Sequence, residues 1–228
     1  MGVQDKVISS HFIRGGMEVR TIGGREVTLR SGSDTCLITF YADFDENMVD
    51  DLFSRIPDVS IADVRVRDWN SELSPWDAPP VFGKEGFGHG AQEFLDYILE
   101  SLLPELGARR YIIGGYSLAG LFSLWACYRT DAFIGCAAAS PSVWFPGWDG
   151  FIQGNRMSTQ RVYLSLGDRE ARTRNQAVCN VADRIRLQHD VLQEQLGPEN
   201  TLIEWNPGNH FVDFPERMAK AFRWTAGV

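Results

Sequence analysis

The chain has 228 residues, of which 44% are hydrophobic and 23% are charged, and its formal net charge is -8. This length suffices for the core of one full-sized α/β domain. The acidic balance argues against nucleic acid and against an anionic membrane as partners, because both attract basic surfaces. No apolar run approaches the roughly 18 residues that are needed to span a bilayer.

The N-terminal stretch MGVQDKVISSHF has neither the pattern of a signal peptide nor that of a myristoylation site. The four cysteines are scattered and form no CxxC pair or metal-binding spacing; they are Cys36, Cys127, Cys136 and Cys179. We therefore expect a cytoplasmic, reducing location and neither a metal nor another cofactor. The sequence does not indicate an oligomeric state.

The first part of the chain predicts strands on both sides of a long loop. Met17–Arg20 and Glu26–Arg30 flank a turn sequence and predict a β-hairpin, so that residues 1–34 form an edge of the main sheet. Thr35–Tyr41 is a continuous apolar run, which is typical of a strand buried on both faces. The next expected elements are the helix Glu46–Ile56, the strand Val59–Val66, a Trp- and Pro-rich loop over Arg67–Gly90 and the helix Ala91–Leu106.

The second part of the chain continues to alternate strands and helices. The expected elements are the strand Arg110–Gly114, the helix Leu118–Tyr128, the strands Phe133–Ala139 and Arg161–Leu166, the helix Asn175–Leu196, the strand Thr201–Trp205 and the helix Phe214–Trp224. This order predicts an α/β fold with a mostly parallel sheet covered by helices on both faces. We expect a single domain over residues 1–228, without a separate lid domain.

The stretch GGYSLAG, residues 114–120, places Ser117 between a predicted strand and a predicted helix. A serine at such a sharp turn is typical of a nucleophile elbow, whose pattern is G-x-S-x-G. Here Ala119 stands at the second glycine position, which adds one methyl group where the strand and helix must approach closely. We interpret it as a tolerated variant. The alternative is a serine that only caps the following helix.

A nucleophilic serine needs a base, and the base needs an acid that orients it. Two histidines follow Ser117: His189 lies within a predicted helix, whereas His210 lies in a loop after the last strand. The position of His210 suits a base, although a histidine there could also cap the last helix. The acid is expected in the turn that begins at Gly167, where Glu170 is favoured and Asp168 remains an alternative.

Four blocks of the sequence, GYSLAGLF, SPSVWF, SLGDRE and GNHF, resemble the esterase branch of the α/β-hydrolases. That branch includes esterase D and the enterochelin-esterase-like hydrolases. The resemblance covers the region from the elbow to His210, and in its coarse order of elements it extends back to Thr35. It implies Ser117 as the nucleophile, His210 as the base and a carboxylate of the Gly167 turn as the acid.

An oxyanion hole requires backbone N–H groups that point at the developing negative oxygen. One donor is expected to be the N–H of Leu118, directly after the nucleophile. The second is expected from the turn after the strand Thr35–Tyr41, at Ala42 or Asp43. An ordinary β-turn is the alternative at that place.

Aromatic residues gather in two loops that should lie at the carboxyl ends of the strands, where open α/β sheets bind ligands. They are Trp69, Trp76, Trp144, Phe145 and Trp148. We expect them to wall a pocket for an apolar or aromatic group, although each could instead pack its loop onto the domain. The glycines of residues 83–90 follow no strand, which excludes a phosphate-binding loop, and His89 there is expected to be solvated.

The sequence thus predicts a serine hydrolase that cleaves a small-molecule carboxylic ester through an acyl-enzyme. A thioesterase or an acyltransferase would use the same residues. A binding protein with a hydrolase fold and no turnover is the alternative from a different class. The presence of all three elements, serine, acid and histidine, favours the enzyme.

Overall fold

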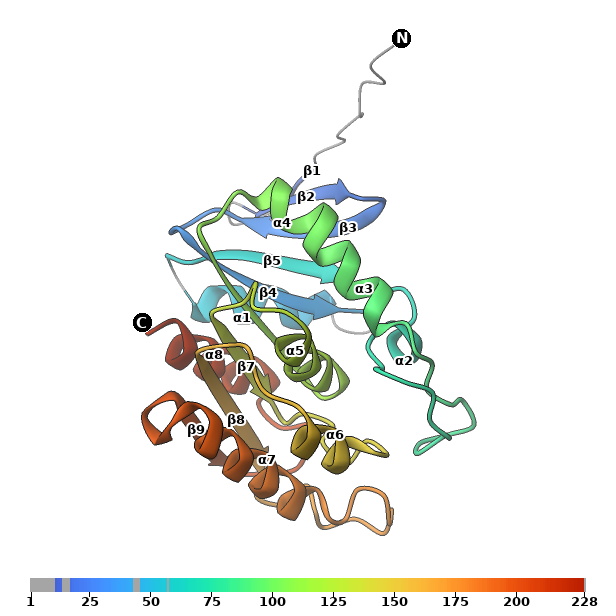
Figure 1. Ribbon diagram of the computed structural model, residues 1–228. Helices are drawn as coiled ribbons and strands as arrows, with labels where there is room; N and C mark the ends of the chain where they lie inside the picture. The colour runs from blue at the N-terminus through green and yellow to red at the C-terminus, as the bar shows by residue number, and fades with distance from the viewer. Residues whose placement is uncertain (1–10, 14–16, 43–45, 57, 228) are drawn as a thin grey trace.

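The computed structural model describes residues 11–13, 17–42, 46–56 and 58–227. In these ranges nine strands form one mixed sheet in the order β1-β2-β3-β5-β4-β6-β7-β8-β9 (Figure 1). The strands are β1 (His11–Ile13), β2 (Met17–Ile22), β3 (Arg25–Arg30), β4 (Thr35–Tyr41), β5 (Ser60–Arg65), β6 (Arg110–Tyr116), β7 (Gly135–Ala139), β8 (Arg161–Gly167) and β9 (Thr201–Asn206).

The predicted hairpin forms one end of this sheet. Strands β2 and β3 pair antiparallel, and β3 pairs antiparallel with β5. Gly23 and Gly24 form the turn between β2 and β3, with φ angles of 55° and 80°. Glycine at both central positions suits the two-residue turn of a hairpin, since such a turn requires positive φ twice. The hairpin therefore extends the main sheet.

From β5 to β9 every strand pair is parallel. All seven residues of β4 are buried, as are all five of β7. Strands with both faces covered by helices have no solvated side, which explains their continuous apolar sequence. The carboxyl ends of these strands meet at one edge of the sheet, and the loops at this edge carry the candidate site.

Helices cover both faces of the sheet (Figure 1). On one face lie α1 (Glu46–Arg55) and α8 (Phe214–Ala226), which share an apolar cluster with β4, β6 and β7. On the other face lie α3 (Ala91–Tyr97), α5 (Leu118–Arg129), α6 (Trp148–Gly154) and α7 (Val181–Leu196). No helix of the described ranges is long and apolar enough to cross a membrane.

The predicted helix over residues 91–106 is divided into three parts. A π-helical segment (Ile98–Leu102) separates α3 from α4 (Leu103–Leu106). Pro104 lies at the start of α4 and has no N–H to donate one turn back. This missing hydrogen bond favours a local change of helical pitch. The sequence pattern therefore locates the helix correctly but does not show the bulge.

Two of the further differences from the expected elements have local causes. The long loop contains a short helix, α2 (Trp69–Glu72), because Asp68 accepts a hydrogen bond from the Ser71 amide at 3.0 Å and caps it. Helix α7 begins at Val181 because the Asn175 side chain accepts a hydrogen bond from the amide of residue 177 and forms a turn instead. Helix α6 and the 3-10 turn η2 (Pro198–Asn200) were not expected.

Candidate active site

Ser117 lies in the sharp turn between β6 and α5. Its φ and ψ angles are 57° and −121°, a combination that costs free energy for any residue with a Cβ atom. The surroundings fix it: its amide donates to the Ala139 carbonyl at 3.2 Å, and its carbonyl accepts from the Ser142 amide at 2.9 Å. This is the backbone geometry that the sequence predicts for an elbow.

The glycines around Ser117 allow β6 and α5 to approach closely. A Cβ atom on Gly115 would lie 2.5 Å from the Ala119 carbonyl carbon and 2.6 Å from the Ala119 Cβ. A Cβ atom on Gly120 would lie 2.9 Å from the Gly115 carbonyl oxygen. Ala119 itself is fully buried. The turn therefore requires glycine at positions 115 and 120 and accommodates the one methyl group of Ala119.

His210 lies in the loop between β9 and α8 and forms a hydrogen bond with Glu170. The distance between His210 Nδ1 and Glu170 Oε2 is 2.8 Å. Glu170 follows β8 and is 8% exposed. Its other oxygen, Oε1, accepts hydrogen bonds from the Ser140 hydroxyl at 2.7 Å, the Gly167 amide at 2.7 Å and Arg217 Nη1 at 3.0 Å. The carboxylate is thus buried with its acceptor sites used.

The surroundings of Glu170 keep it ionised. Burial alone would raise the pKa of this carboxyl, but the hydrogen bond and electrostatic attraction of the His210 imidazole and the hydrogen bonds from Ser140 and Gly167 outweigh it. The pKa of Glu170 therefore lies below its ordinary value. An ionised, buried carboxylate on Nδ1 holds the imidazole in one orientation and leaves Nε2 as the nitrogen that can accept a proton.

The sequence leaves Asp168 open as an alternative acid, and the structure places it elsewhere. Its carboxylate accepts a hydrogen bond from the Gly208 amide at 2.9 Å and lies 3.8 Å from Arg169. The Asp168 side chain is 57% exposed. Asp168 thus connects the turn after β8 to the loop that carries His210, whereas Glu170 contacts the imidazole.

Ser117, Glu170 and His210 line one cavity of about 650 Å³. Within the described residues the hydroxyl of Ser117 has a hydrogen-bonding neighbour in the Ser142 hydroxyl, at 3.3 Å, and none in His210. The structure thus brings Glu170 and His210, the predicted acid and base, into contact and places Ser117 in the same cavity. The aromatic rings of Trp69, Phe82, Trp144 and Phe211 form much of the remaining wall.

The five aromatic residues expected to wall a pocket divide into two groups. Trp69 and Trp144 line the cavity. Trp76, Phe145 and Trp148 are not among its lining residues: the ring of Trp76 lies 5.9 Å from that of Phe145 and 6.4 Å from that of Trp148. Phe145 and Trp148 are fully buried. These three residues pack the loops onto the domain instead of lining the cavity. Sequence alone could not distinguish these two roles.

Two of the three predicted oxyanion donors, Leu118 and Ala42, lie within the described residues. Leu118 is the first residue of α5, and Ala42 is a buried residue that directly follows β4. Asp43 lies outside the described residues. Thr39 and Phe40, near the end of β4, line the cavity. The end of β4 thus faces the same space as Ser117, and an N–H donor from Ala42 remains a prediction.

The sequence reasoning missed Arg217, which is 1% exposed and contacts Glu170. A signal for it does exist. The buried face of α8 includes residues 217, 221 and 225, at a spacing of four, so that an arginine stands in line with Ala221 and Thr225. A charged residue at an apolar helical position indicates a buried polar partner, since such a charge is rarely buried alone.

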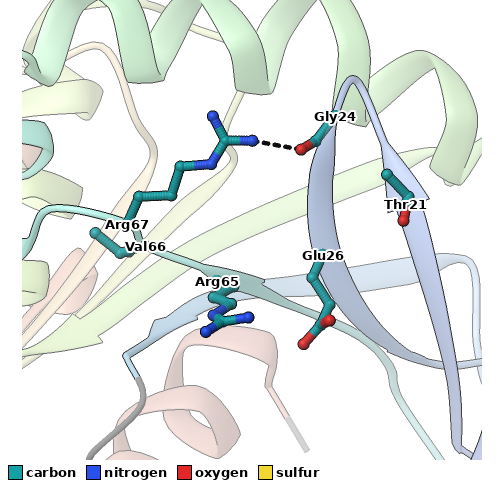
Figure 2. A pocket seen from close by; sticks show the side chains of 6 residues that line it. All are labelled: Thr21, Gly24, Glu26, Arg65, Val66 and Arg67. Carbon is teal, nitrogen blue, oxygen red and sulfur yellow. Dashed lines mark hydrogen bonds between the residues drawn. The ribbon is translucent and has the colours of Figure 1, made fainter.

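A second, smaller cavity of about 410 Å³ lies between the β2–β3 hairpin and the end of β5 (Figure 2). Its charged lining residues are Glu26, Arg65 and Arg67, and Arg67 donates a hydrogen bond to the Gly24 carbonyl. Its lining includes no serine, cysteine or histidine. The cavity that contains Ser117 is therefore the candidate active site. Nowhere in the described ranges do three or more His, Cys, Asp or Glu side chains gather as a metal site would require.

Comparisons with known proteins agree with this architecture. No family model matches the sequence. The chain is 23% identical over 189 residues to the uncharacterised protein YbbA of Bacillus subtilis, with 76% of this chain and 75% of that protein covered. An IroE-like serine hydrolase from Shewanella oneidensis has a TM-score of 0.69 and 17% identity, with 88% of this chain and 75% of that chain covered.

The chain has the α/β-hydrolase fold. The siderophore hydrolase EstA from Aspergillus nidulans matches 100% of this chain and 97% of its own, with a TM-score of 0.65 and 16% identity. The enterobactin esterase FES from Shigella flexneri matches 95% of this chain and 61% of its own, with a TM-score of 0.62 and 13% identity. The fold predicted from the sequence is thereby confirmed.

In the α/β-hydrolase fold a nucleophile, an acid and a histidine follow one another along the chain. Here Ser117 follows β6, Glu170 follows β8 and His210 follows β9. Each lies just beyond the carboxyl end of a strand of the same parallel array. Both the order of these residues along the chain and their place at this edge of the sheet match the positions that the fold offers for a nucleophile, an acid and a histidine.

Proposed function

We propose that this protein is a serine hydrolase that cleaves a carboxylic ester, with Ser117 as nucleophile, His210 as base and Glu170 as the acid that orients it. The observation that supports this most directly is the buried Glu170–His210 hydrogen bond of 2.8 Å in the cavity that Ser117 lines. A serine that only capped a helix would need neither this pair nor the backbone geometry of an elbow.

The proposed reaction has two steps. Ser117 Oγ attacks the ester carbonyl carbon while its proton passes to His210 Nε2, and the C=O bond electrons move to the oxygen. The Leu118 amide and a second amide, from Ala42 or Asp43, donate to this oxyanion. The intermediate collapses, the C–O bond breaks, and the alcohol leaves with the proton from His210. Water then attacks the acyl-enzyme with the same proton transfers and releases the acid.

The ionised Glu170 stabilises the imidazolium that forms in each step. In the proposed reaction the Ser117 hydroxyl turns toward His210 by rotation about its side-chain bond, away from the Ser142 hydroxyl, which lies 3.3 Å from it in this structure. We expect this rotation when an ester enters the cavity, since catalytic hydrogen bonds often form only in the substrate complex.

The lining of the cavity suits a large ester that carries aromatic and anionic groups. Its wall offers the rings of Trp69 and Trp144, and its lining also includes Arg169 and Arg172. Two structural neighbours are named siderophore hydrolase and enterobactin esterase. Siderophore esters are therefore the first substrates to test. A thioester, or transfer of the acyl group to a second alcohol, would use the same machinery and belongs in the same panel.

The decisive experiment is labelling with a fluorophosphonate probe, followed by peptide mapping. We expect one adduct, on Ser117, and none in a folded Ser117→Ala variant. A panel of acyl esters and thioesters of graded size then defines the substrate class. If the folded protein resists the probe and hydrolyses no member of the panel, the enzyme proposal is wrong and a binding protein is favoured.

A further inference from the structure

Arg217 is a buried cation in contact with Glu170, although the mechanism above does not use it. It comes from the first turns of α8 and its side chain is 1% exposed. Arginine is rarely buried this fully unless its donors are paired. Its Nη1 donates to Glu170 Oε1 at 3.0 Å and to the Tyr116 hydroxyl at 2.9 Å, and it lies 3.2 Å from the Ser140 hydroxyl.

The other end of the guanidinium holds the loop that carries His210. Arg217 Nη2 donates to the Pro207 carbonyl at 3.0 Å and to the Asn209 carbonyl at 3.1 Å. These two carbonyls flank Gly208, whose φ is 106°. One side chain therefore contacts the acid and both sides of the bend that precedes the histidine.

Tyr116 links the same network to the nucleophile. Its hydroxyl accepts from Arg217 and donates to the His210 carbonyl at 2.7 Å. Tyr116 is the last residue of β6, directly before Ser117. Glu170, the His210 loop and Tyr116, the residue directly before Ser117, thus share hydrogen bonds with a single guanidinium.

We infer that Arg217 is a positioning residue that holds the Glu170 carboxylate and the His210 loop in register with the elbow. The inference rests on the proposed function for its kinetic consequences, but the geometry of the Glu170–His210 pair can be measured without turnover. A planar guanidinium with two separate donor edges can bind a carboxylate and two carbonyls at once. The single ammonium of lysine could keep the charge but not all of these contacts.

Two variants of Arg217 distinguish the effect of its charge from the effect of its hydrogen bonds. Arg217→Met removes both the charge and the hydrogen bonds, whereas Arg217→Lys keeps a positive charge near Glu170. Arg223→Met is the matched control, because Arg223 lies on the same helix but is 37% exposed and pairs with Glu216 at 2.8 Å. Thermal unfolding establishes which variants are folded before any kinetic comparison.

We expect kcat of Arg217→Met for a short activated ester to fall about 10²-fold, the loss typical of a displacement near 1 Å. The acid limb of the kcat/KM–pH profile of Arg217→Met should move to higher pH. Without the neighbouring cation, the Glu170–His210 pair binds a proton more readily, whether the proton lies on the carboxylate or on the imidazole. Arg217→Lys should lose kcat while its acid limb stays near that of the wild type. Arg223→Met should change neither.

The pair can also be observed by NMR of protein with ¹⁵N-labelled histidine, since the chain has four histidines. We expect a downfield proton signal from His210 Nδ1–H, assigned by its loss in Glu170→Gln. It should shift or disappear in Arg217→Met and stay in Arg223→Met. This readout holds even if the wild-type protein hydrolyses no ester, in which case the proposed function fails while the positioning role is still measured.

The inference is overturned if Arg217→Met is folded and retains the wild-type kcat, acid limb and histidine signal. It is also overturned if Arg223→Met loses as much kcat as Arg217→Met, since the effect would then be general to α8. If Arg217→Met does not fold, Arg217→Lys decides: an unchanged kcat and an unchanged histidine signal in that variant would equally refute the role.

Discussion

The elbow can be tested by adding one methyl group, with the substitution Gly115→Ala. The new Cβ would lie 2.5 Å from the carbonyl carbon of Ala119, 2.6 Å from its Cβ and 2.7 Å from its oxygen. Ordinary contacts between such atoms are near 3.5–4.0 Å. Strand β6 and helix α5 must therefore separate by about 1 Å for the methyl group to fit.

The size of the effect follows from this displacement. Overpacking of a tight interior costs about 1–3 kcal/mol, and we expect a value near the upper end because two of the three close atoms are backbone. A shift of about 1 Å at Ser117 should lower turnover roughly 10²-fold. The double variant Gly115→Ala/Ala119→Gly should restore neither stability nor turnover, since the carbonyl atoms of residue 119 remain in place.

The measurements are hydrolysis of a small activated ester and denaturant unfolding of the wild type, Gly115→Ala and the double variant. A stable Gly115→Ala with full turnover would show that the strand and helix are not tightly apposed at this turn. Full recovery in the double variant would show that the Ala119 methyl group, and not the backbone, limits the space.

Further expectations concern Ala119, the two carboxylates, pH and the aromatic wall. Ala119→Gly should retain turnover and lose about 0.5–1 kcal/mol of unfolding free energy, while Ala119→Val should lose most of its turnover; equal behaviour of the two would contradict the steric argument. Glu170→Gln should lower kcat by about 10⁴-fold, whereas Asp168→Asn should lower it far less, and steady-state kinetics would reveal the reverse ranking. Because the pKa of Glu170 is lower in the folded chain than its ordinary value of 4.5, its ionised form stabilises the fold above pH 4.5 and this contribution is lost as the pH falls through the folded-state value. Denaturation at several pH values should therefore show a steeper acid loss for the wild type than for Glu170→Gln. Trp69→Ala, at a partly buried ring of the cavity wall, should raise KM for bulky aromatic esters with little change for acetyl esters, while Trp148→Ala, at a fully buried ring outside the cavity lining, should instead lose about 3–5 kcal/mol of stability; a common effect of both would argue against the division of the aromatic residues.

Much of the fold follows from patterns that are local in the sequence. The buried strand Thr35–Tyr41 has the same bounds in the structure, because a strand covered on both faces leaves an unbroken apolar run. Helix α5 begins at Leu118 as predicted, since the elbow fixes its start. The sequence pattern predicts the start of α7 six residues too early, because Asn175 forms a turn whose side-chain hydrogen bond competes with the helix.

The site was predictable where each residue follows a strand, and less so where contacts join distant segments. Glu170 and Asp168 lie in the same turn, and only the packing of the His210 loop decides which one reaches the imidazole. Arg217 lies 47 residues after Glu170 in sequence. Its role depends on α8 packing against the sheet beneath the site, which the order of elements does not specify.

The backbone at Ser117 links the stability of the fold to the proposed catalytic role of this residue. Its φ of 57° with ψ of −121° favours glycine, so any side chain there lowers the stability of the fold by about 1–3 kcal/mol. A Ser117→Gly variant should therefore resist denaturant better than the natural chain while forming no acyl-enzyme. The variant would be more stable because it lacks the side chain of the proposed nucleophile, and an intact ester should remain in its cavity long enough for the complex to be crystallised.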